Sequence, residues 1–229
     1  SVDSTVRRAV EAGAVVRTEL APGKGAVVRR MFADIEADIY VMADGDSTYD
    51  TVKAPILVDQ LIDNGLDMVI GARAGITEDP SRRGHAVGNR LFNSLYRLLF
   101  GSGFTDLFSG YRVFSRRFVK SFPAVFMGFE VETEMSVHAS QLQLPVREVE
   151  LPYHPRPDGS ESKLRTVVDG LRVLQAMFIL LLANRPMALL GGAATIFVVC
   201  SAVLGTPVVV DFAQTGLVER LPTAVLATG

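Results

Sequence analysis

Short apolar runs alternate with longer amphipathic stretches along the first two thirds of the chain. Apolar runs predict strands at residues 14–18, 39–43, 66–70 and 145–151. Helical spacing of apolar residues predicts helices at 25–35, 52–64, 85–100 and 131–142. Gly65 stands where a helix C-cap glycine is expected. This order predicts an α/β fold with a doubly wound, mostly parallel sheet. Ligands of such sheets bind at the carboxyl ends of the strands.

The last quarter of the chain has a different pattern. Residues 187–210 carry no charged side chain, and a helix of this length would reach about 36 Å, enough to cross a hydrocarbon core of about 30 Å. The alternative is a buried core helix, which rarely stays uncharged for so long. Residues 221–227 resemble the beginning of a second hydrophobic segment. We therefore expect a membrane region over residues 186–229.

The charges flanking this segment predict its orientation. Basic residues precede the apolar segment, whereas Asp211 and Glu219 follow it, so the positive-inside rule places the preceding domain on the cytoplasmic side of a membrane. Residues 164–185 are mixed at first and apolar later, with Arg165 and Arg172 seven positions apart on one helical face. We expect a helix lying along the membrane interface. It could instead belong to the span or pack on the soluble domain.

Composition excludes several classes. The 229 residues carry 23 Lys and Arg against 25 Asp and Glu, a net charge of −2, so no basic field exists to hold nucleic acid. One cysteine and three histidines exclude a disulfide scaffold and a cysteine-rich zinc site. A hydrophobic content of 48% excludes disorder. The sequence opens directly on a helix pattern, so we expect the first strand of the domain to precede Ser1, which would make the chain N-terminally truncated.

Asp44-Gly45-Asp46 is the strongest local signal, because it directly follows a predicted buried strand. Two carboxylates at i and i+2 can face one Mg²⁺ or Mn²⁺, with phosphate oxygens of a substrate completing the coordination. A solvated acidic turn is the alternative. An EF-hand loop is excluded, because Tyr49 and Pro55 stand where that loop needs glycine and glutamate.

Glycines and cations form weaker signals. Gly23-Lys24-Gly25 precedes a helix, where free backbone N–H groups could bind an anion, or it is a flexible turn with a surface lysine. No Walker A motif or G-x-G-x-x-G fingerprint is present. Arg73 ends a predicted strand. Arg90, Ser94 and Arg97 share one helix face, which could hold a phosphate beside the membrane or be an ordinary solvated face.

Three further segments concentrate polar chemistry. Residues 106–112 combine Asp106, a serine, a glycine and Arg112. Residues 128–134 place acids at alternate positions, which could orient sugar hydroxyls, act as bases or simply favour a helix start. Residues 153–163 form a Pro- and Gly-containing loop with Arg156 and Lys163, either a phosphate-binding lid or a linker.

The ordered set of motifs resembles family-2 glycosyltransferases of the GT-A fold, and more narrowly dolichol-phosphate mannose synthase and other polyprenyl-phosphate glycosyltransferases. The resemblance covers about 160 residues and rests on Ser1 to Thr5, Gly23 to Gly25, Val41 to Asp46, Gly71 to Arg73, Arg90 with Ser94, Asp106 to Arg112, Gly128 to Glu134, and Arg156 to Lys163. It implies a catalytic domain over residues 1–163, before the interfacial helix and the membrane region.

The resemblance also implies roles. The enzyme would transfer a sugar, with inversion, from a nucleotide-diphosphate sugar to a polyprenyl or dolichyl phosphate at a lipid membrane. Mg²⁺ or Mn²⁺ would bind Asp44 and Asp46, and the donor would contact Lys24, Asp44 and Asp106. Asp46, Arg73 and Glu130 are the candidate catalytic residues. The acceptor phosphate would be held by Arg90, Ser94, Arg156 and Lys163, with help from Arg73. Some members of the resembled group have a glutamine as a third metal ligand at the position where this chain has Thr48. A homo-oligomer is also compatible with the resemblance.

Other functions make different demands. A processive polysaccharide synthase resembles this fold but uses a Q-x-x-R-W motif, which a chain without tryptophan cannot contain. A non-catalytic, membrane-anchored module that binds nucleotide-sugar remains open, as does a glycosyltransferase with another acceptor. A nucleotidyltransferase would share the acidic site but would release pyrophosphate.

Overall fold

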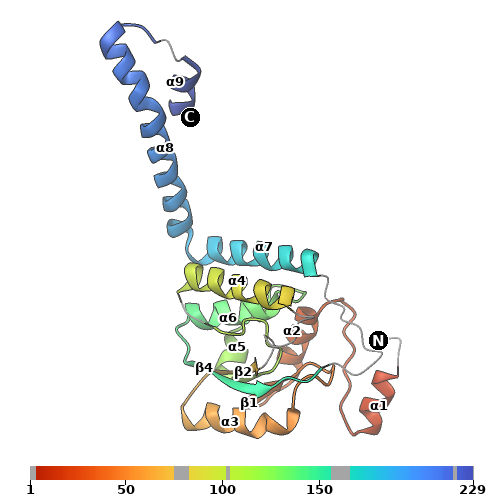
Figure 1. Cartoon of the computed structure of the whole chain (residues 1–229). Helices are drawn as coiled ribbons and strands as arrows, with labels where there is room; N and C mark the ends of the chain where they lie inside the picture. The colour runs from red at the N-terminus through yellow and green to blue at the C-terminus, as the bar shows by residue number, and fades with distance from the viewer. Residues whose placement is uncertain (1–3, 75–82, 102–103, 156–165, 219–220, 229) are drawn as a thin grey trace. The chain divides into compact units, whose positions relative to one another are not determined.

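The computed structural model describes residues 4–74, 83–101, 104–155, 166–218 and 221–228. The chain divides into two compact units, one up to Phe178 and one from Ile179 onward. The first unit is an α/β domain and the second is helical, and each is described by itself below (Figure 1).

The α/β unit is built on a four-stranded sheet of order β1-β3-β2-β4. The strands are β1 (Ile39–Met42), β2 (Met68–Ala74), β3 (Arg112–Ser115) and β4 (Val146–Pro152). β2 and β4 pair in parallel, whereas β3 is antiparallel to both β1 and β2. The predicted mostly parallel sheet is therefore wrong, and the sheet is mixed. The cause is β3, which the sequence analysis did not identify as a strand and which is inserted between two strands that share a direction.

Helices cover both faces of the sheet (Figure 1). One face is covered by α3 (Ala54–Asp63), which follows a short 3-10 turn over Thr51–Lys53. The other carries α2 (Lys24–Asp34), α5 (Arg116–Ser121) and α6 (Val131–Gln141). The next layer contains α4 (Arg83–Phe100) and the part of α7 (Thr166–Asn184) up to Phe178. These bounds confirm the predicted helices to within a few residues, including the left-handed Gly65 after α3 (φ 59°).

The N-terminal segment departs from expectation. It forms α1 (Thr5–Glu11), but residues 14–18 pair with no strand in the described structure. Val15 is 77% exposed, so the apolar residues of this run have no face of a sheet to pack against. The predicted strand over residues 14–18 is therefore wrong.

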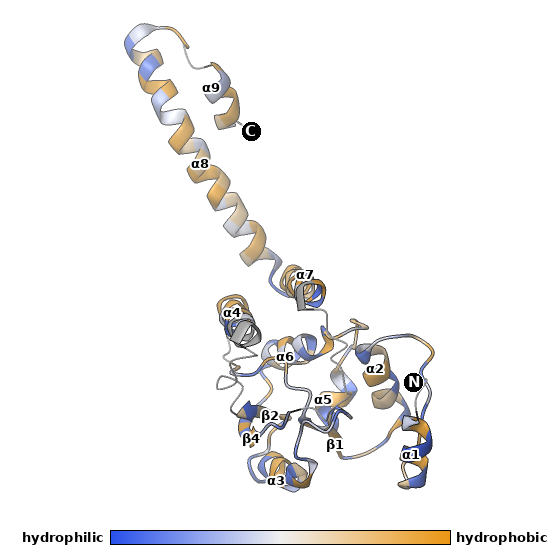
Figure 2. Ribbon diagram, turned by 45° about the vertical axis from the view of Figure 1, so that its right-hand side comes forward, coloured by the Kyte–Doolittle hydropathy of each residue, from blue (hydrophilic) through white to orange (hydrophobic). Residues whose placement is uncertain are grey.

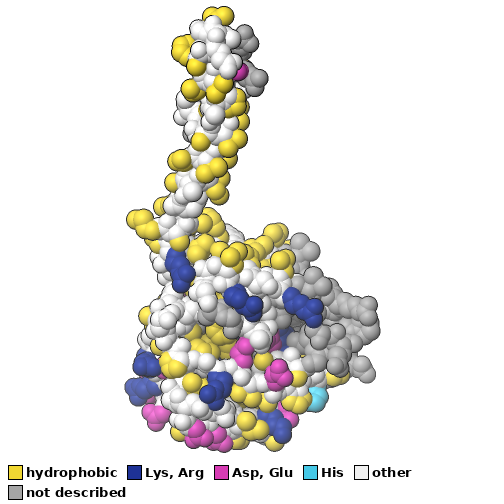
Figure 3. Space-filling model, turned by 60° about the vertical axis from the view of Figure 1, so that its left-hand side comes forward, with side chains coloured by type: hydrophobic (Ala, Val, Ile, Leu, Met, Phe, Trp, Pro, Cys, Tyr) yellow, Lys and Arg dark blue, Asp and Glu magenta, His cyan; other side chains and the backbone are white. Residues whose placement is uncertain are grey.

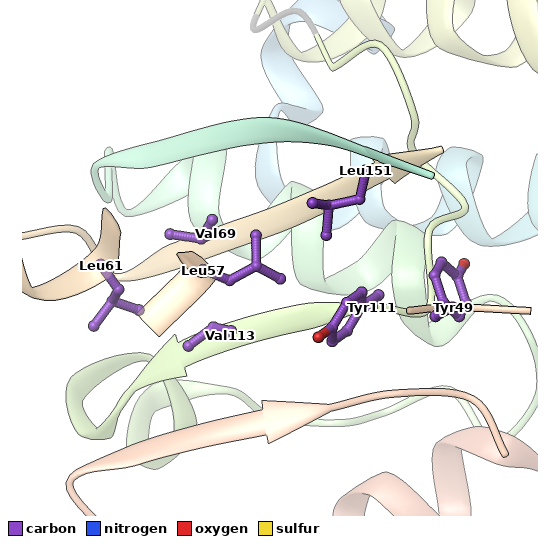
Figure 4. Packing of buried hydrophobic residues seen from close by; sticks show 7 residues of the cluster. All are labelled: Tyr49, Leu57, Leu61, Val69, Tyr111, Val113 and Leu151. Carbon is purple, nitrogen blue, oxygen red and sulfur yellow. The ribbon is translucent and has the colours of Figure 1, made fainter. Parts of the chain in front are cut away.

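The core beneath α3 fixes the sheet (Figure 4). Leu57 and Leu61 from α3 pack on Val69, Val113 and Leu151 from the three strands β2, β3 and β4. Tyr49 and Tyr111 extend this cluster toward the carboxyl ends of β2 and β4, with ring centroids 5.4 Å apart. Apolar burial on this face therefore anchors the sheet edge at which the polar residues gather.

Truncation of Leu57 tests this core. Leu57 is fully buried, so Leu57→Ala should lower the free energy of unfolding by about 2–5 kcal/mol. The neighbouring Ile56 is 44% exposed, and Ile56→Ala should change it by less than about 1 kcal/mol. Chemical denaturation of the full chain in detergent, followed by tyrosine fluorescence, measures both. Equal effects of the two variants would contradict the described packing of α3.

The second unit contains α8 (Pro186–Thr215) and α9 (Leu221–Thr228). α8 is the one helix in the described part of the chain that is long and apolar enough to cross a membrane, with mean hydropathy 2.3. Most of the length of α8 is coloured as hydrophobic in Figure 2, and its visible surface shows no Lys or Arg side chains (Figure 3). Its most apolar 18-residue stretch is entirely unburied. The predicted helix over residues 187–210 is confirmed, and α9 matches the predicted second apolar segment.

Candidate active site

The predicted site residues gather at one edge of the sheet. The loop after β1 carries Asp44 and Asp46, and β2 brings Arg73 near its carboxyl end. Because β3 runs in the opposite direction, the loop that precedes it, with Asp106, reaches the same edge. The N-termini of α2 and α6 add Lys24 and Glu132. The expectation that polar chemistry lies at the carboxyl ends of the parallel strands is met, although the sheet is mixed.

The loop after β1 is a tight turn. The Asp46 carboxylate accepts hydrogen bonds from the Thr48 hydroxyl (2.6 Å) and backbone N–H (3.2 Å). Between them Ser47 adopts a left-handed conformation with φ 60°, which is uncommon for a residue other than glycine. Thr48 is fully buried. Thr48 therefore orients the Asp46 carboxylate.

Lys24 joins two carboxylates across this edge. Its ammonium Nζ lies 2.5 Å from Asp44 Oδ1 and 2.5 Å from Glu132 Oε1. The Lys24 side chain is only 17% exposed and that of Glu132 only 5%. Burial disfavours the ammonium, but the two carboxylates outweigh burial and raise the pKa of Lys24. Burial raises the pKa of Glu132, with Lys24 opposing that shift. Lys24 is therefore the cation that neutralises this cluster.

Gly110 forms the wall of this cluster. A Cβ atom at Gly110 would lie 2.3 Å from Asp44 Oδ2 and 2.8 Å from Lys24 Nζ. The backbone N–H of Gly110 donates to the Tyr49 hydroxyl at 2.9 Å, which fixes the position of the loop. Only glycine lets the backbone approach the ion pair this closely.

The glycines around Lys24 have another role than the one predicted. The N–H of Gly25 donates to the carbonyl of Met127 at 2.8 Å, and that of Ala26 does so at 3.3 Å. A Cβ on Gly23 or Gly25 would lie about 2 Å from the carbonyl oxygens of residues 126–127. The amides of Gly25 and Ala26 are therefore satisfied within the protein and are not free to bind an anion. The glycines permit close packing that holds Lys24 in place.

Arg73 and Asp106 form a bidentate ion pair. Arg73 Nε lies 2.7 Å from Asp106 Oδ2 and an Nη atom lies 2.6 Å from Oδ1, while the Arg73 backbone N–H also donates to Oδ2. Burial lowers the pKa of Arg73, but Asp106 outweighs burial and raises it. The guanidinium lies 5.5 Å from the ring centroid of Tyr153. Asp106 uses two of its five N–H groups, so Arg73 keeps donors for an anion.

Acidic residues of α6 separate into different roles. Glu134 accepts hydrogen bonds from the backbone N–H groups of Val125 and Phe126, so it holds the segment that packs on α2. Glu132 turns to Lys24, and its Oε2 is buried without a partner in the described structure. The Glu130 carboxylate lies beside Gly128 and has no hydrogen-bond partner among the described residues. Glu132, which the sequence analysis did not select, is the glutamate that joins the site.

The predicted acceptor residues are placed only in part. Arg90 and Ser94 are exposed on α4, on the face they were predicted to share. Arg156 and Lys163 lie outside the described residues. Leu91 and Leu98 on the same helix are 68% and 81% exposed, because α4 buries Asn93, Tyr96 and Phe100 instead.

Comparison with protein families decides between the classes of function. Residues 1–122, more than half of the chain, match the model of Glycosyl transferase family 2. The chain belongs to glycosyl transferase family 2. This confirms the family and the enzyme class predicted from the motifs.

Curated relatives of this family 2 chain come from bacteria and archaea. An uncharacterized protein of Shigella flexneri is 45% identical over 120 residues, covering 52% of this chain and 74% of the relative. Glycosyltransferase AglJ of Haloferax volcanii is 35% identical over 83% of this chain and 63% of its own length. The low-salt glycan biosynthesis hexosyltransferase Agl6 of the same organism is 31% identical over 78% of this chain and 44% of its own length. The chain therefore spans less than two thirds of AglJ and of Agl6.

A solved structure shares the fold. Glucosyl-3-phosphoglycerate synthase of Mycobacterium tuberculosis, in complex with Mn²⁺, UDP-glucose and phosphoglyceric acid, has a TM-score of 0.61 at 22% identity. The match covers 79% of this chain and 65% of that one. At this identity the likeness establishes the GT-A-like α/β fold alone.

The carboxylates of this family 2 chain fit a divalent cation that also binds substrate. No group of three or more His, Cys, Asp or Glu side chains in the described residues could hold a metal by itself. Asp44 and Asp46 supply hard oxygen ligands at a partly exposed edge, which is the chemistry that Mg²⁺ and Mn²⁺ use when phosphate oxygens complete the coordination. The donor set therefore fits a cation that binds together with a nucleotide.

Gly110→Ala tests the close approach at Lys24. The new methyl group should displace the ends of the Asp44 and Lys24 side chains. Because misplaced charged groups bind the reacting groups less well, transferase activity should fall at least about tenfold. The melting temperature should change little, because flexible side chains absorb the clash. Gly88→Ala is the control, since a Cβ there meets nothing within 4 Å. Unchanged activity of Gly110→Ala would contradict the role given to this glycine.

Proposed function

We propose that this family 2 chain is a membrane-associated inverting glycosyltransferase that moves a hexose from a nucleotide-diphosphate sugar to a polyprenyl or dolichyl phosphate. The observation that carries the proposal is the joining of Asp44, Lys24 and Glu132 beside Asp46 and the Arg73–Asp106 pair at one edge of the sheet. This set combines carboxylates for a cation with fixed cations for phosphates.

The donor end of the reaction follows from these charges. A divalent cation held by Asp44 and Asp46 would neutralise the diphosphate as it leaves the sugar. Lys24 lies beside Asp44 at 2.5 Å and can donate to the same diphosphate. Asp106 fixes Arg73 through two bonds, so the remaining N–H groups of Arg73 face a bound anion in a defined direction. The chain therefore supplies preorganised charge where the leaving group develops its own.

The acceptor end needs little base catalysis. A polyprenyl phosphate is already anionic near neutral pH, so its oxygen can attack the anomeric carbon without losing a proton first. Arg90 and Ser94 on the exposed face of α4 would hold this phosphate, together with Arg156 and Lys163. Glu130, whose carboxylate lies beside Gly128, stays a candidate for contact with the reacting groups. Attack by the phosphate opposite the leaving diphosphate gives an inverted product.

Membrane association is supported by two helices. α8 contains one charged residue, Asp211, and exposes its apolar side chains except that of the buried Val208, as expected of a segment surrounded by lipid. In its part up to Phe178, α7 buries Val173, Ala176 and Met177. The side chains of Leu171 and Phe178 are more than half exposed. This second apolar face fits a helix that lies at the interface. Arg172 and Arg185 precede α8, which supports a cytoplasmic catalytic domain.

Product formation tests the proposal. The full-length protein in detergent should transfer sugar from one member of a panel of nucleotide-sugars to a polyprenyl phosphate, giving a lipid product identified by mass. Asp46→Asn should lower the rate about 100-fold or more, because the cation and leaving group lose a ligand. Asp59→Asn, on the exposed surface of α3, is the matched control and should be neutral. Full turnover by Asp46→Asn would contradict the proposed site.

Other arms of the same assay separate the alternatives. Phosphoglyceric acid, which is bound in the mycobacterial complex, tests for a water-soluble acceptor. Donor binding by calorimetry without product from any acceptor would identify a non-catalytic nucleotide-sugar-binding module instead.

Arg90→Gln tests the acceptor site. Loss of one phosphate contact should raise the apparent KM for polyprenyl phosphate about tenfold and leave the donor KM unchanged. Arg116→Gln is the control, because Arg116 is an exposed arginine on α5 that pairs with Glu36. An equal change in both variants would show a general effect of surface charge rather than a phosphate site.

A further inference from the structure

We propose that Lys24 is a built-in competing cation, which holds the Asp44 carboxylate until a divalent cation and a nucleotide diphosphate arrive together. This inference rests on the proposed function, since it concerns how the same site takes up its donor. It assigns Lys24 a second role, that of restricting access of the metal to Asp44.

The contacts place Lys24 where a cation would bind. Lys24 Nζ lies 2.5 Å from Asp44 Oδ1, so one carboxylate oxygen is already neutralised. The backbone at Gly110 closes the other side, because a Cβ there would lie 2.3 Å from Asp44 Oδ2. A second cation that binds Asp44 at full strength must therefore weaken or displace the ammonium.

Glu132 makes this exchange feasible. Lys24 Nζ is also 2.5 Å from Glu132 Oε1, and the Glu132 side chain is only 5% exposed. The ammonium can thus leave Asp44 while it keeps its bond to Glu132. The backbone beside Lys24 is held in place, because the N–H of the next residue, Gly25, donates to the carbonyl oxygen of Met127 at 2.8 Å. Only the flexible end of a four-carbon side chain changes position.

Charge explains why the cation and the nucleotide should bind together. Asp44 and Glu132 share the single ammonium of Lys24, which lies 2.5 Å from an oxygen of each. A divalent cation alone would place its charge beside the ammonium, which repels it. A diphosphate supplies oxygens both to the cation and to the displaced ammonium. The arrangement therefore predicts weak binding of the metal alone and much tighter binding with nucleotide.

A matched pair of variants isolates this competition. Glu132→Gln keeps Lys24 on Asp44, whereas Lys24→Met/Glu132→Gln removes the ammonium and leaves no buried carboxylate unpaired at position 132. The probe is Mn²⁺ alone, without nucleotide or acceptor, bound to the full chain in detergent. Electron paramagnetic resonance of free Mn²⁺ gives the dissociation constant.

We expect the double variant to bind Mn²⁺ about tenfold more tightly than Glu132→Gln, because removal of one adjacent positive charge is worth at least this factor at a partly exposed site. Addition of Asp44→Asn to the double variant should abolish the gain. UDP should tighten Mn²⁺ binding strongly in Glu132→Gln and less in the double variant. Equal or weaker Mn²⁺ binding by the double variant would overturn the inference.

Two controls keep the outcomes distinct. Melting temperatures verify that each variant folds. A second double variant, Lys24→Gln/Glu132→Gln, has a polar, neutral side chain at position 24 in place of the apolar methionine. If both double variants bind Mn²⁺ no better than Glu132→Gln, the competing role is wrong even where the wild-type protein makes lipid-linked sugar. If the wild type makes no product while the affinity gain is seen, the proposed reaction fails and the competition stands.

Discussion

A fully buried guanidinium fixes the geometry on which the site depends. Arg112, at the start of β3, donates to the carbonyl oxygens of Ser109 (2.9 Å) and Leu107 (2.7 Å) and to the hydroxyl of Ser136 on α6 (3.0 Å). Burial lowers its pKa, and an arginine in this position must keep its bonds, since an unsatisfied buried charge is strongly destabilising. Arg112 thus sets the distance between the loop that carries Asp106 and Gly110 and the helix that carries Glu132.

Charges at the site are paired before any substrate binds. Lys24 pairs with Asp44 and Glu132, and Arg73 pairs with Asp106, so the cost of gathering like charges is already offset within the fold. Glu148 contributes from β4 by accepting hydrogen bonds from the backbone N–H groups of Thr105 and Asp106. On the proposed function, a donor would enter by exchanging partners with these ion pairs.

Much of this arrangement was predictable from sequence, and the failures have physical causes. Asp44 and Asp46 follow an apolar run, and the rule for strand ends placed them correctly. β3 was missed because only two of its four residues, Val113 and Phe114, are apolar, although Arg112 beside them is also buried. Glu132 was missed because its role depends on rotation: two positions along a helix turn a side chain by about 200°, so Glu132 and Glu134 point to opposite sides. Gly110 and the glycines beside Lys24 matter through neighbours that are distant in sequence, which no local pattern contains.

The insertion of β3 between β1 and β2 also constrains how the domain is made. β1 and β2 share a direction and lie on either side of β3, so neither completes its pairing until residues 112–115 have been synthesised. The sheet then gains β4 at residues 146–152, before α8 begins at Pro186. Such pairing between distant segments is slow, because a long loop must close before any contact stabilises it. During translation the nascent chain would therefore carry an unpaired edge of β2 for the time needed to add some forty residues, from Ala74 to Arg112.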